Sequence, residues 1–259
     1  MHRTSSQPGR LAAFVSASGS AGTLGAGDYL KDRHNARIVA VEALEVPTML
    51  YNGFGDHNIQ GIGDKHVPLI HNVTNTDLIV GVSDKATDRL DVAFNSAAGL
   101  RALERQGVNS DLTSMLTNLG YSAICNALAA IKAAKHWGLG PDDVIVTVAT
   151  DGAELYNSER EKVIRRDYPN GFNDAEGEEV VAKYLVDTTT DHVLDMDETN
   201  RIRVFNLGYI TWVEQQGISV EDFERRRDQT WWNGLRPLID NWDNSIDEFN
   251  EATGAKHLK

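Results

Sequence analysis

One stretch of the chain combines glycine and hydroxyl residues in a pattern suited to binding an anion. It is Ser16–Thr23, with the sequence SASGSAGT. An apolar stretch, Leu11 to Val15, comes directly before it, and a stretch that can open a helix, Leu24 to Leu30, comes directly after it. A strand, a glycine-rich turn and a helix start together make a cradle for a phosphate group.

The residue types inside this turn supply the donors that a phosphate needs. Gly19 and Gly22 can adopt backbone angles closed to other residues, which lets main-chain N–H groups crowd around an anion. The helix start adds unsatisfied N–H groups and partial positive charge. The hydroxyls of Ser20 and Thr23 are further donors. The sequence therefore predicts a phosphate site here.

Four apolar runs predict the strands that position this turn. They lie near residues 11–15, 37–43, 77–82 and 144–149. The first two, with a helix between them, occupy about thirty residues, the pattern of a right-handed parallel β-α-β unit. We expect a three-layer α/β sandwich with a mainly parallel sheet. Thr150 to Gly152 then follow the last strand, at the carboxyl end where ligands of open parallel sheets bind.

The character of the chain changes beyond about residue 160. Charged, helix-prone sequence takes over, and it holds four of the five tryptophans. Pro237 suits the first turn of a last helix. An apolar stripe follows at helical spacing, formed by Leu238, Trp242, Ile246 and Phe249. We therefore expect an α/β domain over residues 1–160 and a helical extension over 161–259.

Composition bounds the class of protein. The net charge of −13 disfavours partners that need a basic surface, so we expect neither nucleic acid nor an anionic membrane. Apolar runs are too short to span a bilayer, and the first ten residues lack the apolar core of a secretion signal. A single cysteine, Cys125, excludes an internal disulfide and fits the reducing cytoplasm.

Two interpretations of the glycine turn compete. In the first it is a dinucleotide site, with Glu42 at the end of the second strand as the ribose-binding acid. The glycines at positions 19, 22, 25 and 27 do not form the G-x-G-x-x-G pattern of such sites. That interpretation predicts a nicotinamide-dependent oxidoreductase.

The second interpretation uses more of the chain. FVSASGSAGTLGAGDYLKDRHNARIVAVE at 14–42 and GDHNIQGIGDKHVP at 55–68 resemble segments of the fold-type-II pyridoxal-phosphate enzymes. Two later segments also resemble that family, VSDKAT at 82–87 and VIVTVATDGAELY at 144–156. The similarity is strongest to its cysteine synthase and cystathionine β-synthase branch, which also resembles the tryptophan synthase β chain. These segments follow the family's order over about residues 11 to 160.

The resemblance implies pyridoxal phosphate as cofactor, an amino acid as substrate and a homodimeric assembly. It assigns the cofactor phosphate to the glycine turn, backbone contacts to the IQGIG segment and the pyridine nitrogen to a hydroxyl at the end of a central strand. The implied residues are Gly19, Ser20, Ala21, Gly22 and Thr23 for the phosphate, Gly61, Ile62 and Gly63 for the backbone contacts, and Thr150 for the nitrogen. We expect the neighbouring Asp151 to point the other way. A hydroxyl at the nitrogen favours β-elimination or β-replacement over transamination.

The chain departs from the family in one respect. Those enzymes hold the cofactor as a Schiff base on a lysine of an S-x-K motif upstream of the phosphate loop. No lysine precedes Ser16, and the sole S-x-K, Ser83 to Lys85, lies downstream of it. Lys31 lies on the helix behind the turn. We predict no catalytic residue on this chain itself, which resembles the carboxyl-terminal portion of a lyase or transferase, or a subunit that a lysine-bearing partner completes.

Two alternatives remain open: a non-catalytic or regulatory partner of a lysine-bearing enzyme, and the oxidoreductase.

A metal site is not predicted. His57, His66 and His71 lie close together in the sequence, but their spacing matches no standard ligand pattern. Cys125 lies on an alanine-rich helix and is expected to be a small core residue.

Overall fold

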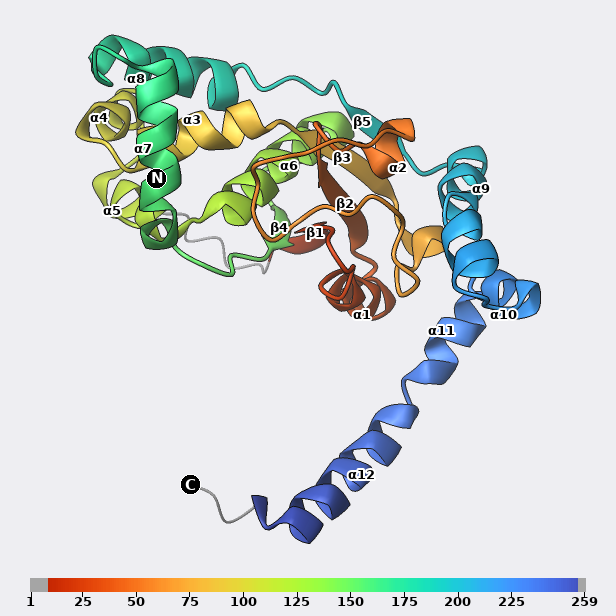
Figure 1. Cartoon of the computed structure of the whole chain (residues 1–259). Helices are drawn as coiled ribbons and strands as arrows, with labels where there is room; N and C mark the ends of the chain where they lie inside the picture. Colours follow the sequence, from red (N-terminus) through yellow and green to blue (C-terminus); the bar gives the residue numbers. More distant parts are fainter. Residues whose placement is uncertain (1–8, 256–259) are drawn as a thin grey trace.

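The predicted mainly parallel sheet is confirmed by the computed structural model, which describes residues 9–255 (Figure 1). Its five strands lie in the order β4-β1-β2-β3-β5. They are β1 (Arg10–Ala17), β2 (Arg37–Ala43), β3 (Leu78–Val82), β4 (Asp143–Thr147) and β5 (Val193–Asp195). The pairs β4-β1, β1-β2 and β2-β3 are parallel, whereas β3-β5 is antiparallel. The sequence did not predict β5, because three residues are too few to show a strand period.

Helices cover both faces of this sheet, so the α/β class is confirmed. The α-helices are α1 (Leu24–His34), α2 (Thr48–Tyr51), α3 (Asp84–Phe94), α4 (Ala97–Arg105), α5 (Ser110–Ser114), α6 (Tyr121–Trp137), α7 (Asn157–Asp167), α8 (Asp174–Val181), α9 (Glu198–Asn206), α10 (Val220–Arg225), α11 (Gln229–Leu235) and α12 (Leu238–Thr253). Alternate residues of β2 show the two faces. Val39 and Val41 pack in the core with α3 and α6, while Ile38 and Ala40 pack in the core with α1 and α9.

The position of β4 differs from the prediction. We expected its end to belong to a central strand, but β4 lies at the edge of the described sheet and pairs with β1. Val144 and Val146 are 43% and 40% exposed there. A run of valines has the composition of a buried strand wherever it lies, so the sequence could not place β4 within the sheet. The carboxyl ends of β4 and β1 lie side by side, because the two strands are parallel neighbours.

The region expected to be a helical extension is mostly helical, but it also contains β5 and two π-helical turns, at Ala182–Val186 and Ile210–Gln215. The domain boundary at residue 160 stays a prediction. The outer ends of the two predicted domains, residues 1–8 and 256–259, lie outside the described residues. No helix among residues 9–255 is long and apolar enough to cross a membrane.

Glu42 at the end of β2 caps a helix instead of facing a ligand. Its side chain is 3% exposed. The backbone N–H groups of Met49 and Leu50, in α2, donate to its two carboxylate oxygens at 3.0 and 2.7 Å. Burial raises the pKa of this carboxyl to about 7. Both oxygens are engaged by α2, which argues against the ribose-binding role that the dinucleotide interpretation required.

The raised pKa of Glu42 predicts a specific loss of stability with rising pH. A carboxyl whose folded-state pKa exceeds its unfolded value stabilises the fold fully below the unfolded pKa, and this contribution is lost as pH rises through the folded pKa. Glu42→Gln does not titrate. We therefore expect the unfolding free energy of the wild type to fall relative to Glu42→Gln by about 2–3 kcal/mol between about pH 4.5 and pH 8.

Urea unfolding of both proteins across this pH range measures the difference. Glu161→Gln, on an exposed face of α7, is the matched control and should follow the wild-type profile. A difference between wild type and Glu42→Gln that does not change with pH would contradict the account of Glu42.

Candidate active site

A pocket of about 240 Å³ opens at the carboxyl ends of β1 and β4. Its lining comes from four segments that are distant in the sequence. The lining residues are Ser16, Ala17, Gly19, Ser20, Ala21, Thr23, Gln60, Gly61, Ile62, Ser122, Asn126, Val148, Thr150, Asp151 and Tyr156. The structure thus brings together the glycine turn, the IQGIG segment and Thr150. Of the nine predicted site residues, Gly22 and Gly63 are not among the lining residues.

The glycine turn presents a row of backbone donors to this pocket. Among the described residues, no hydrogen bond is made by the backbone N–H groups of residues 19–23. The carbonyls of Ala21 and Gly22 accept from the first N–H groups of α1, at 3.1 and 3.2 Å. No acidic residue lies in the first turn of α1, so nothing there neutralises the positive end of the helix. The N–H groups and the helix end are suited to an anion.

The backbone angles of the turn correct one expectation. The residue in the left-handed region is Ala21, with φ of 68°, and neither Gly19 nor Gly22 has a positive φ. Gly19 instead lies close to a second segment, because a Cβ built on it would sit 3.5 Å from the carbonyl oxygen of Gly61. A hydrogen bond of 2.9 Å from the Ser16 hydroxyl to that of Thr23 closes the turn.

The IQGIG segment is fixed against the turn by Gly63. Its N–H donates to the carbonyl of Ser18 at 2.8 Å. Gly61 and Gly63 have φ of 80° and 85°, which few other residues adopt. A Cβ on Gly63 would also lie 2.3 Å from Nε2 of His57. Gly63 therefore supports the turn from behind, whereas Gly61 and Ile62 reach the pocket.

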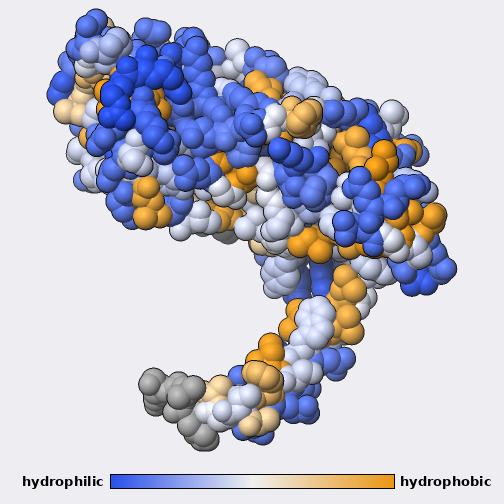
Figure 2. All heavy atoms as spheres, viewed as in Figure 1, coloured by the Kyte–Doolittle hydropathy of each residue, from blue (hydrophilic) through white to orange (hydrophobic). Residues whose placement is uncertain are grey.

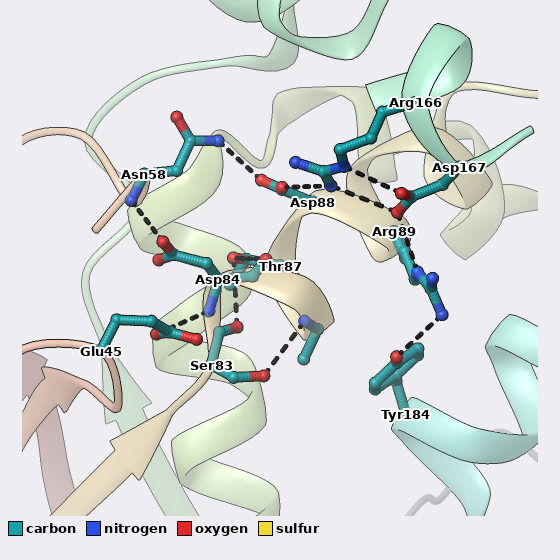
Figure 3. Close-up of polar contacts among 11 residues, drawn as sticks. Glu45, Asn58, Ser83, Asp84, Thr87, Asp88, Arg89, Arg166, Asp167 and Tyr184 are labelled. Carbon is teal, nitrogen blue, oxygen red and sulfur yellow. Dashed lines mark hydrogen bonds and ion pairs between the residues drawn. The ribbon is translucent and has the colours of Figure 1, made fainter. Parts of the chain in front are cut away.

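Helix α3 holds the other end of this segment (Figure 3). Asn58 donates from its backbone N–H to Asp84 at 2.6 Å and from its side chain to Asp88 at 2.8 Å. Glu45 in turn accepts from the backbone N–H of Asp84 at 3.0 Å. Burial raises the pKa of Asp84 to about 6. Arg166 pairs with Asp88 on its far side at 3.0 Å, so the anchor continues into α7.

Asn126 links the two strands that form the pocket. From α6, its side-chain oxygen accepts from the N–H of Ala17 at 2.7 Å, and its amide donates to the carbonyl of Val148 at 2.9 Å. The side chain is buried, with 3% exposure. It thereby satisfies two backbone groups where β1 and β4 diverge. Sequence reasoning missed it, although a lone amide within the alanine-rich run of α6 was a signal.

The surroundings of Thr150 also differ from expectation. Because β4 ends at Thr147, the strand alternation that would turn Asp151 away does not apply. Asp151 lines the pocket too, and its carboxylate accepts from the hydroxyls of Thr150, at 3.3 Å, and Tyr156. The hydroxyl of Ser122 lies 3.3 Å from that of Thr150. The pocket therefore offers a hydroxyl and a carboxylate side by side.

No lysine lines this pocket in the described part of the chain. The ammonium group of Lys31 binds Asp77 at 2.8 Å and the carbonyl of Asn75 at 2.7 Å. Asp77 directly precedes β3, so Lys31 lies at the amino ends of the parallel strands, whereas the pocket lies at their carboxyl ends. Lys85 lies on α3 and is not among the lining residues either.

The histidines and the cysteine have other surroundings. His71 is buried, with its Nε2 3.0 Å from the hydroxyl of Thr76. His66 lies 3.2 Å from a carboxylate oxygen of Asp64. Cys125 is buried, and burial raises the pKa of its thiol. Among residues 9–255, no group of three or more His, Cys, Asp or Glu side chains is placed to hold a metal ion.

Comparison with known proteins supports the resemblance. No family model matches the chain. Cysteine synthase B of Campylobacter jejuni is 33% identical over 147 residues, which cover 56% of this chain and 42% of that protein. Among solved structures, a hydrogen sulfide-producing enzyme from Fusobacterium nucleatum is 28% identical, with a TM-score of 0.44, over 57% of this chain and 40% of that one. O-acetyl serine sulfhydrylase isoform 3 from Entamoeba histolytica is 25% identical, with a TM-score of 0.48, over 68% and 46%.

The sequence match confirms the relationship that the motifs predicted: this chain is related to the cysteine synthase branch of the fold-type-II pyridoxal-phosphate enzymes. The chain spans less than half the length of each of these relatives.

The linking role of Asn126 can be tested by a near-isosteric substitution. Asn126→Leu keeps the branching of the side chain at Cγ but removes the partners of the buried N–H of Ala17 and of the half-buried carbonyl of Val148. Each such group costs about 1–3 kcal/mol, so we expect the unfolding free energy to fall by about 2–5 kcal/mol. Ser122→Ala, one turn earlier on α6, should cost less than about 1 kcal/mol. Equal effects of the two substitutions in urea unfolding would contradict the role of Asn126.

Proposed function

We propose that this chain forms the cofactor-phosphate half of a pyridoxal-phosphate enzyme that carries out β-elimination or β-replacement on an amino acid. The main support is the row of N–H groups at residues 19–23, which make no hydrogen bond within residues 9–255 and lie at the start of α1. All of these residues except Gly22 line one pocket with Thr150. The relationship to a cysteine synthase supports the same assignment.

The residues present fit one end of the cofactor well. Gly19, Ser20, Ala21, Gly22 and Thr23 would hold its phosphate by backbone N–H groups and by the Ser20 and Thr23 hydroxyls. Gly61 and Ile62 would lie against the ring, with Gly63 fixing their backbone. When bound, the cofactor withdraws electrons from the α-carbon of an attached amino acid. This chain's part is to bind, orient and tune it.

Two side chains compete for the pyridine nitrogen. The Thr150 hydroxyl can donate to an unprotonated nitrogen, whereas the Asp151 carboxylate would hold a proton on it. A hydroxyl leaves the ring a weaker electron sink, which favours elimination or replacement. In the structure the single proton of the Thr150 hydroxyl is donated to Asp151, so this hydroxyl would have to turn from the carboxylate to the ring nitrogen when the cofactor binds. We assign the nitrogen to Thr150 because the resemblance places a hydroxyl there, and Asp151 keeps the Tyr156 hydroxyl as a donor.

The covalent lysine must come from elsewhere in the complete enzyme. No lysine lines the pocket among residues 9–255, and the chain spans 42% of its curated relative. We propose that a lysine-bearing segment or subunit completes the site, and that the assembly works in the cytoplasm. The chain alone should bind the cofactor weakly and without covalent attachment. A regulatory, non-catalytic role is the alternative, and no contact among residues 9–255 favours it.

The assignment of Thr150 can be tested on this chain by binding alone. Pyridoxal phosphate and its carbocyclic analogue, in which CH replaces the ring nitrogen, share shape and phosphate. A hydrogen bond that a hydroxyl donates to the ring nitrogen contributes about 1–3 kcal/mol to the binding free energy. We therefore expect wild type to bind pyridoxal phosphate about 5- to 150-fold more tightly than the analogue in equilibrium dialysis. Thr150→Val should remove this preference.

Asp151→Asn is the matched control and should retain the preference. Loss of the preference in Asp151→Asn, with retention in Thr150→Val, would assign the nitrogen to the carboxylate and contradict elimination chemistry. Failure of wild type to bind either compound would contradict the proposed function itself.

A further inference from the structure

The last two helices form an arm that projects from the body of the protein (Figure 1). Its root is fixed. Gln229 at the start of α11 exchanges two hydrogen bonds of 2.9 Å with Asn72, and Arg236 pairs with Asp32 of α1 at 2.8 Å. Beyond this root, no residue of α12 is buried. The arm is therefore held in one place while its outer helix lies in solvent.

One face of the exposed helix α12 is apolar. Figure 2 shows hydrophobic residues gathered along the arm. Ile239, Trp242, Ile246 and Phe249 are between 51% and 66% exposed. We call these four residues the arm stripe. At 16 residues α12 is only slightly longer than the about 12–15 residues below which isolated helices are marginal in water, and packing of an apolar face is what normally stabilises such a helix. The arm stripe therefore requires a partner surface.

The spacing of the arm stripe identifies the kind of partner. The four residues are separated by three, four and three positions, which is the a/d repeat of a coiled coil. A surface helix that packs on the body of its own protein usually shows a wider apolar face. The a and d residues of a coiled-coil helix form a narrow apolar seam, which packs against the same seam of another helix. A second copy of this chain supplies such a helix.

The charges of α12 lie where such pairing allows them. The helix carries five acidic residues and no Lys or Arg. In the register of the arm stripe, Asp240 and Asp247 occupy b positions, Glu248 a c position and Glu251 an f position, all away from the seam. Only Asp243, at an e position, flanks the seam. Acidic residues off the seam keep the arm in water without opposing the contact.

The area available is enough for a specific contact. From their exposure, the arm stripe and the neighbouring Leu238 offer roughly 500 Å² per copy. Two copies together would bury about 1,000 Å², the lower bound for a specific interface.

We propose that two copies of this chain associate through their arm stripes, pairing α12 with α12 as a short coiled coil. The contact lies outside residues 11–160, where the segments that resemble the family lie, and does not depend on the proposed function.

The full-length chain tests this by sedimentation equilibrium. The wild type should have twice the 28.5 kDa mass of one chain. Ile246→Asp puts a carboxylate into the seam and should raise the dimer dissociation constant at least about tenfold. Asn244→Asp adds the same charge at an f position and is the matched control, which should stay dimeric. Trp242→Ala provides a second seam variant without added charge and should also weaken the dimer.

Salt and hydrogen exchange separate this contact from others. Because both arms are acidic, an about tenfold rise in salt should leave the dimer unchanged or strengthen it. Exchange protection on dimerisation should be confined to the arm. A monomeric wild type, a dimer that survives Ile246→Asp and Trp242→Ala, or a dimer that salt dissociates would each overturn the proposal.

Discussion

The backbone between β1 and α1 imposes the constraint on which the site depends. Residues 19–23 leave their N–H groups without partners in the described chain, at the positive end of a helix. Ser20, Gly22 and Thr23 are exposed, so water can satisfy their N–H groups until an anion takes its place. The surrounding contacts fix its shape. Ser16 and Thr23 close the turn, and Gly63 holds the IQGIG segment against it.

The same constraint explains why distant segments are fixed so firmly around a small pocket. Asn126 satisfies backbone groups of both β1 and the residues after β4. Asn58 fastens the IQGIG segment to α3, and the chain of ion pairs behind α3 reaches α7. Each link satisfies polar groups that would otherwise be orphaned as the strands diverge. The pocket is thus positioned by hydrogen bonds to secondary structure on both sides of the sheet.

Much of this was predictable from the sequence, for physical reasons. The strand-turn-helix pattern at Ser16–Thr23 and the β-branched strands predicted the parallel sheet, and the family resemblance predicted that the turn and Thr150 belong to one site. The edge position of β4 was not predictable, because valines suit buried and edge strands alike. The predicted orientation of Asp151 was wrong because β4 ends at Thr147, three residues before Thr150. The alternation of side chains along a strand therefore does not extend to Thr150 and Asp151. Asn126 acts across 109 positions to Ala17, and such a long-range contact leaves no local pattern.

In the proposed enzyme, the N–H groups of residues 19–23 bind the phosphate of pyridoxal phosphate. Backbone amide chemical shifts, followed by NMR during titration with pyridoxal phosphate and then with pyridoxal, test this binding. We predict that the amides of residues 19–23 shift with pyridoxal phosphate and move far less with pyridoxal, which lacks the phosphate. Shifts confined to other parts of the chain, or equal shifts with both compounds, would contradict the account.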